Sequence, residues 1–277
     1  MRIKELLNGS SKGKIALAYP DAASVEALIT ANADAILVGD EKEIKKINNI
    51  PERFIILNEP ERACEEAVRL VLKKEASALM KGKVDTSIIL RAALDKERGI
   101  RGNDLLSHIA AFETKSHRRI MFLTDAAINI APNPETMQKI IINARDFAYS
   151  ILAREPVIAL LAAKEKPDPR QPVTETASEL CAWGKNKGFN IYGPLALDNA
   201  IDPKSCKIKG IDFSGESDVL VCPNIEAGNI LYKSLAFFAG ARMGGLVLGA
   251  RAPIILTSRA DSADSKLISI LLALKTN

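Results

Sequence analysis

Short runs of apolar residues recur along the chain, and several of them consist only of Ile, Val, Leu and Ala. A strand with one face in water alternates apolar and polar residues, whereas a strand covered on both faces is apolar throughout. Such fully apolar strands are typical of parallel sheets with helices on both sides. We therefore expect strands of mostly parallel sheets at residues 14–19, 35–38, 54–57, 78–80, 120–123, 157–161, 190–192, 219–222, 246–248 and 254–256.

Amphipathic segments separate many of these runs. In residues 62–74 the apolar side chains recur at helical spacing and form one stripe, and Pro134 suits the first position of a helix. We predict helices at residues 62–74, 134–153, 229–241 and 262–274. Strands that alternate with helices predict an α/β protein.

The length of 277 residues favours about two domains, at roughly 150 residues each. The proline-containing segment 129–134 is a candidate boundary between them. The sequence has no apolar run long enough to span a membrane, no signal-peptide pattern at its start and no CxxC pair among its four cysteines. We therefore expect a cytoplasmic protein with no metal centre and no membrane partner.

The positive charge is concentrated in one part of the chain. The net charge is +4, whereas residues 73–119 carry eleven Lys or Arg and six Asp or Glu, a local balance of +5. A local excess favours a site for a small anion over a basic coat for nucleic acid, and a solvated basic face is the alternative. Neither GxGxxG nor GxxxxGK[ST] occurs, so the common dinucleotide and P-loop signatures are absent.

Two polar segments in the first half of the chain are candidates for binding groups. In the first, Lys81 and Gly82 follow an apolar run, and Arg91 ends the helix that comes next. Glycine permits close backbone approach there, and a helix start offers free N–H groups. The second is the run from Ser107 to Glu113, where His108 is one of two histidines. An ordinary strand-to-helix turn and a structural histidine are the alternatives.

Two more polar segments follow apolar runs in the second half. After residues 219–222 come Asn224, Gly228, Asn229 and Lys233, which suit a helix start that holds a phosphate or a carbonyl oxygen. Caps around a tight turn are the alternative.

The last segment follows residues 254–256 and contains Ser258, Arg259, Asp261 and Asp264. A guanidinium binds an oxyanion through two hydrogen bonds at once. The acidic residues are also suited to capping a helix, which is the alternative role for them.

These segments, in this order, resemble the phosphate acetyl/butyryl transferase family, and most strongly its butyryl branch. The resemblance rests on LMKGKVDT with Arg91, SHIAAFE, FLTDAAINIAP, YGPLALDNA, DVLVCPNIEAGNILYK and ILTSRADS. It covers most of the chain, and the last two motifs are the most specific.

The resemblance implies a fold of two α/β domains around an interdomain cleft, related to isocitrate and isopropylmalate dehydrogenases. The first domain would comprise residues 1–130 and 251–277, and the second residues 131–250. The implied reaction converts an acyl-CoA and phosphate into an acyl phosphate and CoA, by direct thiolate attack in a ternary complex in the reverse direction. It implies no cofactor beyond CoA as a substrate, and no nucleic-acid partner. We also expect a homo-oligomer, with contacts through apolar helices such as 229–241.

The resemblance also implies roles for individual residues. Ser258 and Arg259 would hold the thiol, the phosphate or the carbonyl oxygen during the reaction. The groups that would bind substrate are Lys81, Gly82, Arg91, His108, Asn224, Gly228, Asn229 and Lys233.

Two positions depart from the acetyl-specific pattern. Ser265 stands where those members have a carboxylate proposed as the base, so Asp264 is our candidate, and Phe237 stands where they have an arginine. Both differences favour the butyryl branch. A phosphate acetyltransferase, a hydroxyacid dehydrogenase of the same architecture and a non-catalytic acyl-CoA or acyl phosphate binding protein are the alternative functions.

Overall fold

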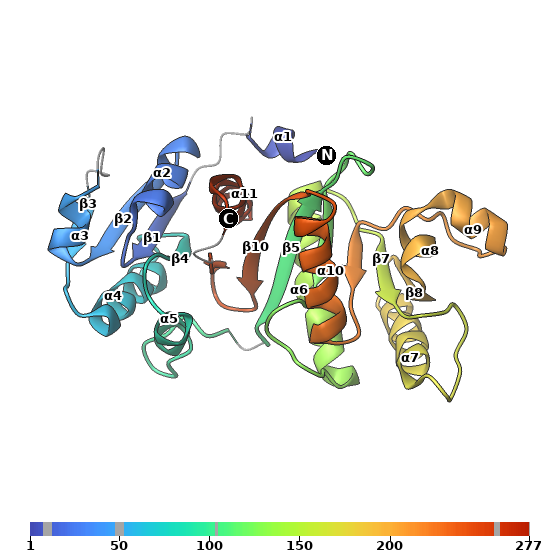
Figure 1. The fold of residues 1–277 in the computed structure, drawn as a ribbon. Helices are drawn as coiled ribbons and strands as arrows, with labels where there is room; N and C mark the ends of the chain where they lie inside the picture. Colours follow the sequence, from blue (N-terminus) through green and yellow to red (C-terminus); the bar gives the residue numbers. More distant parts are fainter. Residues whose placement is uncertain (8–12, 48–52, 103–104, 258–260, 277) are drawn as a thin grey trace. The chain divides into compact units, whose positions relative to one another are not determined.

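The structure is a computed structural model, and it describes residues 1–7, 13–47, 53–102, 105–257 and 261–276. Contacts within the chain divide it into two compact units. Unit 1 comprises residues 1–2 and 107–241, and unit 2 comprises residues 3–106 and 242–277. Each unit is a layered α/β structure (Figure 1).

In unit 2 the strands lie in the order β3-β2-β1-β4-β11-β10. Its strands are β1 (Lys14–Ala18), β2 (Asp34–Gly39), β3 (Arg53–Ile56), β4 (Ala78–Lys81), β10 (Arg242–Leu248) and β11 (Ile254–Ile255). All neighbours are parallel except β10, which runs antiparallel to β11. The helices are α1 (Ile3–Leu7), α2 (Ala22–Thr30), α3 (Glu41–Lys45), α4 (Pro60–Leu72), α5 (Thr86–Ala93) and α11 (Ala263–Lys275).

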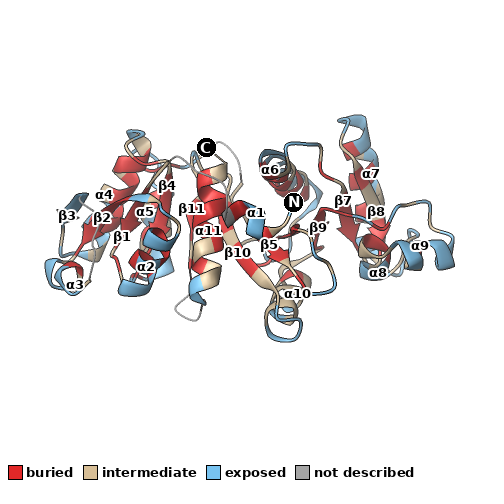
Figure 2. Ribbon diagram, turned by 90° about the horizontal axis from the view of Figure 1, so that it is seen from above, coloured by how far each residue is buried: buried red, intermediate tan, exposed pale blue. Residues whose placement is uncertain are grey.

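Helices cover both faces of this sheet, which explains its continuous apolar strands. Helix α2 packs against α11, and α4 packs against α5 and against β1 and β2 (Figure 1). The predicted apolar stripe of α4 is buried, and burial of β1 and β4 is continuous along both strands (Figure 2). The prediction of parallel strands covered on both faces is confirmed for this unit.

In unit 1 the strands lie in the order β5-β6-β9-β7-β8. Its strands are β5 (Ser107–Glu113), β6 (Met121–Thr124), β7 (Ile158–Leu161), β8 (Ile191–Leu195) and β9 (Val219–Val221). Strands β6, β9, β7 and β8 are parallel, and β5 is antiparallel to β6. The helices are α6 (Pro134–Leu152), α7 (Pro172–Asn186), α8 (Leu197–Ile201), α9 (Pro203–Lys209) and α10 (Ile225–Phe237).

Three elements differ from the sequence predictions. Strand β5 was not among the predicted strands, because its centre contains two alanines, which are weak strand formers. Strand β10 is longer than predicted because Gly244 and Gly245 lie within it, and a Cβ at Gly244 would come within 2.7 Å of the Ser269 backbone nitrogen. Helix α10 begins at residue 225 rather than 229, because Asn224 caps it.

The compact units also differ in extent from the predicted domains. The chain changes unit after residues 2, 106 and 241, whereas the predicted boundaries follow residues 130 and 250. Strand β5 pairs with β6, which places both strands with unit 1, and β10 pairs with β11, which places β10 with unit 2. The domain boundaries inferred from the resemblance remain a prediction. No helix among the described residues is long and apolar enough to cross a membrane.

Candidate functional site

The polar segments that follow β4 and β11 lie beside each other in unit 2. The two strands are parallel, with Ile255 beside Met80, so their carboxyl ends meet at one edge of the sheet. Lys81 ends β4, and the Thr257 hydroxyl donates a hydrogen bond to the Lys81 carbonyl oxygen at 3.2 Å. This pairing brings the predicted segment that contains Lys81 and Gly82 next to Thr257, where the predicted segment after β11 starts.

Gly82 makes the turn after β4 at a position without room for a side chain. Its backbone N–H donates to the carbonyl oxygen of Ala18 at 2.9 Å. A Cβ at this position would collide with the carbonyl oxygen of Tyr19. The sequence predicted a close backbone approach at Gly82, and in unit 2 that approach is to the end of β1.

A cavity of about 280 Å³ opens at this edge, and we call it the lysine pocket. The Lys81 side chain is buried, and its ammonium donates to the carbonyl oxygens of Gly82 at 3.2 Å and Val84 at 3.1 Å. The pocket is lined by Asp21, Ala23, Lys81, Gly82, Lys83, Thr257 and Lys266. These residues give unit 2 a concave, positively charged site at the carboxyl ends of two neighbouring strands.

The predicted catalytic residues follow β11 in the sequence. Ser258 and Arg259 follow Thr257 directly, and both lie outside the described residues. Asp264 lies in the first turn of α11, where its carboxylate accepts two hydrogen bonds from Arg242, at 2.9 and 2.5 Å. This ion pair between α11 and β10 was not expected from the sequence.

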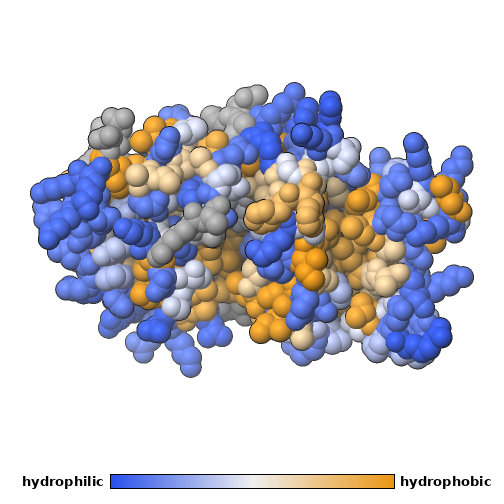
Figure 3. All heavy atoms as spheres, viewed as in Figure 1, coloured by the Kyte–Doolittle hydropathy of each residue, from blue (hydrophilic) through white to orange (hydrophobic). Residues whose placement is uncertain are grey.

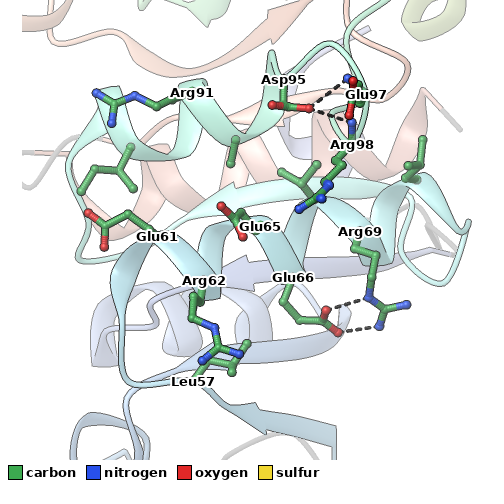
Figure 4. A pocket seen from close by; sticks show the side chains of 14 residues that line it. Leu57, Glu61, Arg62, Glu65, Glu66, Arg69, Arg91, Asp95, Glu97 and Arg98 are labelled. Atoms are coloured by element: carbon green, nitrogen blue, oxygen red, sulfur yellow. Dashed lines mark hydrogen bonds and ion pairs between the residues drawn. The ribbon is translucent and has the colours of Figure 1, made fainter.

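Arg91 lies in a different cavity of unit 2. It is exposed on α5 and is one of the residues that line a pocket of about 630 Å³ formed by α4 and α5 (Figure 4). Arg69 in the same pocket is held by Glu66, and the Asp95 carboxylate accepts from the backbone N–H groups of Glu97 and Arg98. Carboxylates and guanidinium groups share this lining, and Arg91 does not line the lysine pocket.

In unit 1 a buried aspartate organises the second and third predicted segments. Asp125 follows β6, and its carboxylate accepts from the backbone N–H groups of Ala127 at 2.8 Å and Ile128 at 3.0 Å. It also accepts from the backbone and side-chain nitrogens of Asn129, at 3.3 and 2.7 Å, and from the His108 backbone at 3.1 Å. We call residues 125–129 the Asp125 turn.

The start of α10 packs directly on the Asp125 turn. Asn224 caps the helix by accepting from the Ala227 backbone N–H at 2.9 Å. A Cβ at Gly228 would collide with the carbonyl oxygen of Asp125, and the Asn229 side chain donates to the carbonyl oxygen of Ala126 at 3.0 Å. The parallel pairing of β6 with β9 produces this contact, because Thr124 lies beside Val221.

The two remaining predicted residues flank this arrangement. The His108 ring packs edge-on against the Tyr232 ring of α10, with centroids 5.8 Å apart, and Lys233 is exposed on the same helix. The structure therefore brings His108, Asn224, Gly228 and Asn229 together in unit 1, and Lys81 and Gly82 together in unit 2.

Sequence reasoning missed two buried charged residues, Asp125 and Lys266. Asp125 stands within a motif of the family resemblance, and a polar residue at the end of an apolar run was the available signal. Lys266 gave no such signal, since it falls inside an amphipathic helix where a lysine normally faces water. Among the described residues, no group of three or more His, Cys, Asp or Glu side chains is arranged to hold a metal ion.

The cysteines are buried and free, and the pKa values of two of them predict how the folded protein reacts with a thiol reagent. Burial raises the pKa of Cys64 and of Cys222 to about 12, and the Asp125 carboxylate adds to the effect on Cys222. Both groups therefore stay protonated at pH 8, and the thiolate is the reactive form. We expect no reaction of the folded protein with 5,5′-dithiobis(2-nitrobenzoate) at pH 8, and four thiols per chain after denaturation. Fast labelling of Cys222 in the folded protein would contradict this assignment.

Comparison with known sequences identifies the family. The family model described as phosphate acetyl/butaryl transferase matches residues 55–274. The chain is 40% identical to the "Probable phosphate butyryltransferase" of Bacillus subtilis, over 99% of this chain and 97% of that protein. It is also 40% identical to the phosphate butyryltransferase of Clostridium acetobutylicum, over 87% of this chain and 84% of that one.

Solved structures support the same assignment. The branched-chain phosphotransacylase from Enterococcus faecalis has a TM-score of 0.85 and 32% identity, over 95% of this chain and 98% of that one. The 4-hydroxythreonine-4-phosphate dehydrogenase from Klebsiella pneumoniae, with a TM-score of 0.61 and 14% identity over 96% and 99% of the two chains, shares the fold alone. With a matching model over most of its length and close relatives along nearly all of it, the chain belongs to the phosphate acetyl/butyryl transferase family.

Proposed function

We propose that this protein transfers a butyryl or branched short-chain acyl group between CoA and phosphate. The observation that carries the proposal is the pairing of family motifs by strand neighbours: β4 with β11 in unit 2, and β6 with β9 in unit 1. The first pairing sets buried positive charge around a small cavity, and the second presents the start of α10. Anionic substrates and a developing oxyanion are the species that such groups stabilise.

The chemistry needs two substrates held in line and no cofactor beyond CoA as a substrate. The CoA sulfur, as thiolate, attacks the carbonyl carbon of the acyl phosphate, and the carbon–oxygen bond to phosphate breaks. Phosphate leaves with the electron pair of that bond, and the thiol proton passes to a base. In the opposite direction a phosphate oxygen attacks the thioester carbonyl and CoA leaves. Positioning and oxyanion stabilisation supply most of the rate enhancement in such a reaction.

Within this scheme the family motifs give each group a proposed role. Arg259 holds the phosphate or carbonyl oxygen, Ser258 donates to the thiol or the tetrahedral oxygen, and Asp264 receives the thiol proton. The binding groups are Lys81, Gly82, Arg91, His108, Asn224, Gly228, Asn229 and Lys233. The reduced state of the four buried cysteines is compatible with a cytoplasmic location, which we propose with the function.

The test is phosphate-dependent release of free CoA from a series of straight and branched CoA esters, from acetyl to hexanoyl. We expect the highest kcat/KM with butyryl or a branched four- or five-carbon ester. A maximum at acetyl-CoA would assign the protein to phosphate acetyltransfer instead. Phosphate-independent release, or none with any ester, would overturn the proposal.

The proposed role of Asp264 as the general base can be tested separately from its ion pair with Arg242. The two side chains are 40% and 41% exposed, so the pair stabilises the fold by at most about 1 kcal/mol. We expect Asp264→Asn to lower kcat by roughly 100-fold or more, the usual contribution of a general base. Arg242→Gln breaks the same pair and is the matched control, with a much smaller loss of kcat. Equal losses in the two variants would reduce Asp264 to a structural residue.

We propose further that the protein is a homo-oligomer that uses the exposed face of α10. Ile230, Phe237 and Phe238 are 66%, 81% and 92% exposed, and apolar side chains gather on the face that carries α10 (Figure 3). An apolar groove of about 620 Å³ lies against the same helix. Large exposed apolar patches are typical of subunit contacts.

The mass of the protein in solution, measured by light scattering, tests this proposal. We expect the wild-type mass to exceed one chain and the double variant Ile230→Asp/Phe238→Ser to shift toward the monomer. Ile208 on α9 is 85% exposed and serves as the control, since Ile208→Ser leaves α10 unchanged. A monomeric wild type, or an unchanged mass in the double variant, would be evidence against the α10 contact.

A further inference from the structure

A small cavity in unit 1 lies at the carboxyl ends of two neighbouring strands. Its lining includes Pro132, Pro172 and Pro223, and we call it the proline pocket. Strands β7 and β9 are parallel, with Leu160 beside Val221, and both of these residues line the pocket near the ends of their strands. In α/β proteins, ligands gather at the carboxyl ends of parallel strands, so this position is one where a ligand is expected.

The floor of the proline pocket is buried and apolar. Helix α6 packs against α7 and β9, and α7 packs against β7. These four elements supply the floor residues, which are at most 5% exposed: Met137, Leu160, Leu180 and Val221. Among the described residues that line the pocket, none is charged, and Thr176 has the only polar side chain. Such a lining favours an alkyl group over a phosphate.

The rim of the pocket is made of residues with little conformational freedom. Pro132 precedes α6, Pro172 is the first residue of α7 and Pro223 follows β9, and all three are exposed or half-buried. A proline ring fixes φ, so a rim of prolines has little freedom to lose when a ligand binds. The floor residues do not line the groove beside α10, with which the pocket shares Leu161, Pro172, Val173 and Pro223.

The volume of the pocket matches a short acyl chain. It is about 170 Å³, and an apolar cavity of roughly 150 Å³ is large enough to hold benzene, with its six carbon atoms. A butyryl chain or a branched five-carbon chain therefore fits, whereas a long fatty acyl chain does not.

We propose that the proline pocket holds the alkyl chain of the acyl group and that Ala177 leaves the room for it. Pro223 directly precedes Asn224, the cap of α10, and a helix start suits the carbonyl oxygen of the same acyl group. Ala177 is 5% exposed on α7 and has the smallest side chain of the lining. This proposal rests on the proposed function and names the residues that select the acyl group.

The ratio of kcat/KM for butyryl-CoA to kcat/KM for acetyl-CoA, at saturating phosphate, tests the pocket. Each buried methylene group favours binding about four-fold, so the two additional methylenes of butyryl contribute about 15-fold. The larger side chain in Ala177→Leu fills the pocket and should lower the ratio by about 10-fold, with kcat/KM for acetyl-CoA near the wild-type value. Ala182→Leu is the matched control, because Ala182 is exposed on the same helix, and it should keep the wild-type ratio. An unchanged ratio in Ala177→Leu would overturn the proposal.

A second variant enlarges the pocket from α6. Met137→Ala removes most of a floor side chain, so the preferred ester should shift toward hexanoyl-CoA. If Ala177→Leu does not fold, Ala177→Val and Met137→Ala decide, and a wild-type chain-length profile in both contradicts the proposal. A lower mass of Ala177→Leu in light scattering, with an unchanged ratio, would assign the pocket to a subunit contact instead.

Calorimetric binding of CoA esters without phosphate separates the pocket from the transferase function. The wild type should bind butyryl-CoA about 15-fold more tightly than acetyl-CoA, and Ala177→Leu should bind the two almost equally. If this difference is found and no ester reacts with phosphate, the pocket stands and the proposed function fails. If transfer occurs and the wild type binds both esters equally, the function stands and the pocket fails.

Discussion

Replacing Arg259 by alanine is expected to lower kcat/KM for acyl transfer by about 100- to 1000-fold, the usual effect of losing one oxyanion donor. A guanidinium presents fixed, paired hydrogen-bond donors that match a phosphate or a tetrahedral oxyanion. In the alanine variant, water replaces the guanidinium, and that water is not held in position. The motif that contains Arg259 begins directly after Thr257, whose hydroxyl bonds the Lys81 carbonyl in the lysine pocket. The measurement is CoA release from butyryl-CoA at saturating and at limiting phosphate.

Two further variants make the Arg259 result specific. Arg259→Lys keeps the charge but loses the planar fork, so we expect it to fall between alanine and wild type. Arg251 is exposed and belongs to the same unit, and Arg251→Ala is expected to keep full activity. Wild-type kcat/KM in Arg259→Ala would remove this residue from the mechanism.

Replacing Asp125 by alanine is expected to destabilise the protein by about 3–5 kcal/mol and to abolish transfer. The carboxylate is buried and accepts from the backbone of the Asp125 turn, from the Asn129 side chain and from the His108 backbone. Each buried donor left without an acceptor costs roughly 1–3 kcal/mol, and entering water recovers part of that loss. Because α10 packs on this turn through Gly228 and Asn229, the loss reaches the predicted binding residues as well.

Urea unfolding monitored by circular dichroism measures the Asp125 effect. Asp125→Asn keeps one carbonyl oxygen as an acceptor, so its loss of stability should be smaller. Asp202, which caps α9 in the same unit, is the control for losing an ordinary capping carboxylate, and Asp202→Ala should cost less than Asp125→Ala. An Asp125→Ala variant as stable as the wild type would show that water replaces the carboxylate fully.

The elements predicted best from the sequence are those whose environment is uniform along their length. Strand β7 is apolar throughout and β1 is apolar after Lys14, and the α4 stripe repeats at helical spacing, so the local pattern was enough to predict these elements. Strand β5 was not predicted, and β10 was predicted only over its last three residues, because Ala and Gly pairs within these strands remove the strand signal. Such strands form through neighbours that the sequence does not reveal.

The residues of the candidate site also fall into two groups, those that the local sequence predicted and those that it did not. Lys81, Gly82, Asn224 and Gly228 follow apolar runs, where ligands of α/β proteins gather, so position along the chain was enough to single them out. The surroundings of Lys266 and Asp125 depend on strand pairing. Strand β11, which precedes α11, pairs with β4, and β9, which precedes α10, pairs with β6. These pairings join distant segments, and motif spacing carries no information about them.

Unit 2 is assembled from both ends of the chain, and this sets the order in which it can be completed during synthesis. Strand β4 leaves the ribosome early, but its neighbour β11 and helix α11 come from the last part of the chain. Until β11 is synthesised, β4 therefore presents an unpaired edge, the kind of edge that promotes association between chains. A nascent chain that stops before β11 and α11 would therefore lack the strand that closes this edge and the helix that packs beside it.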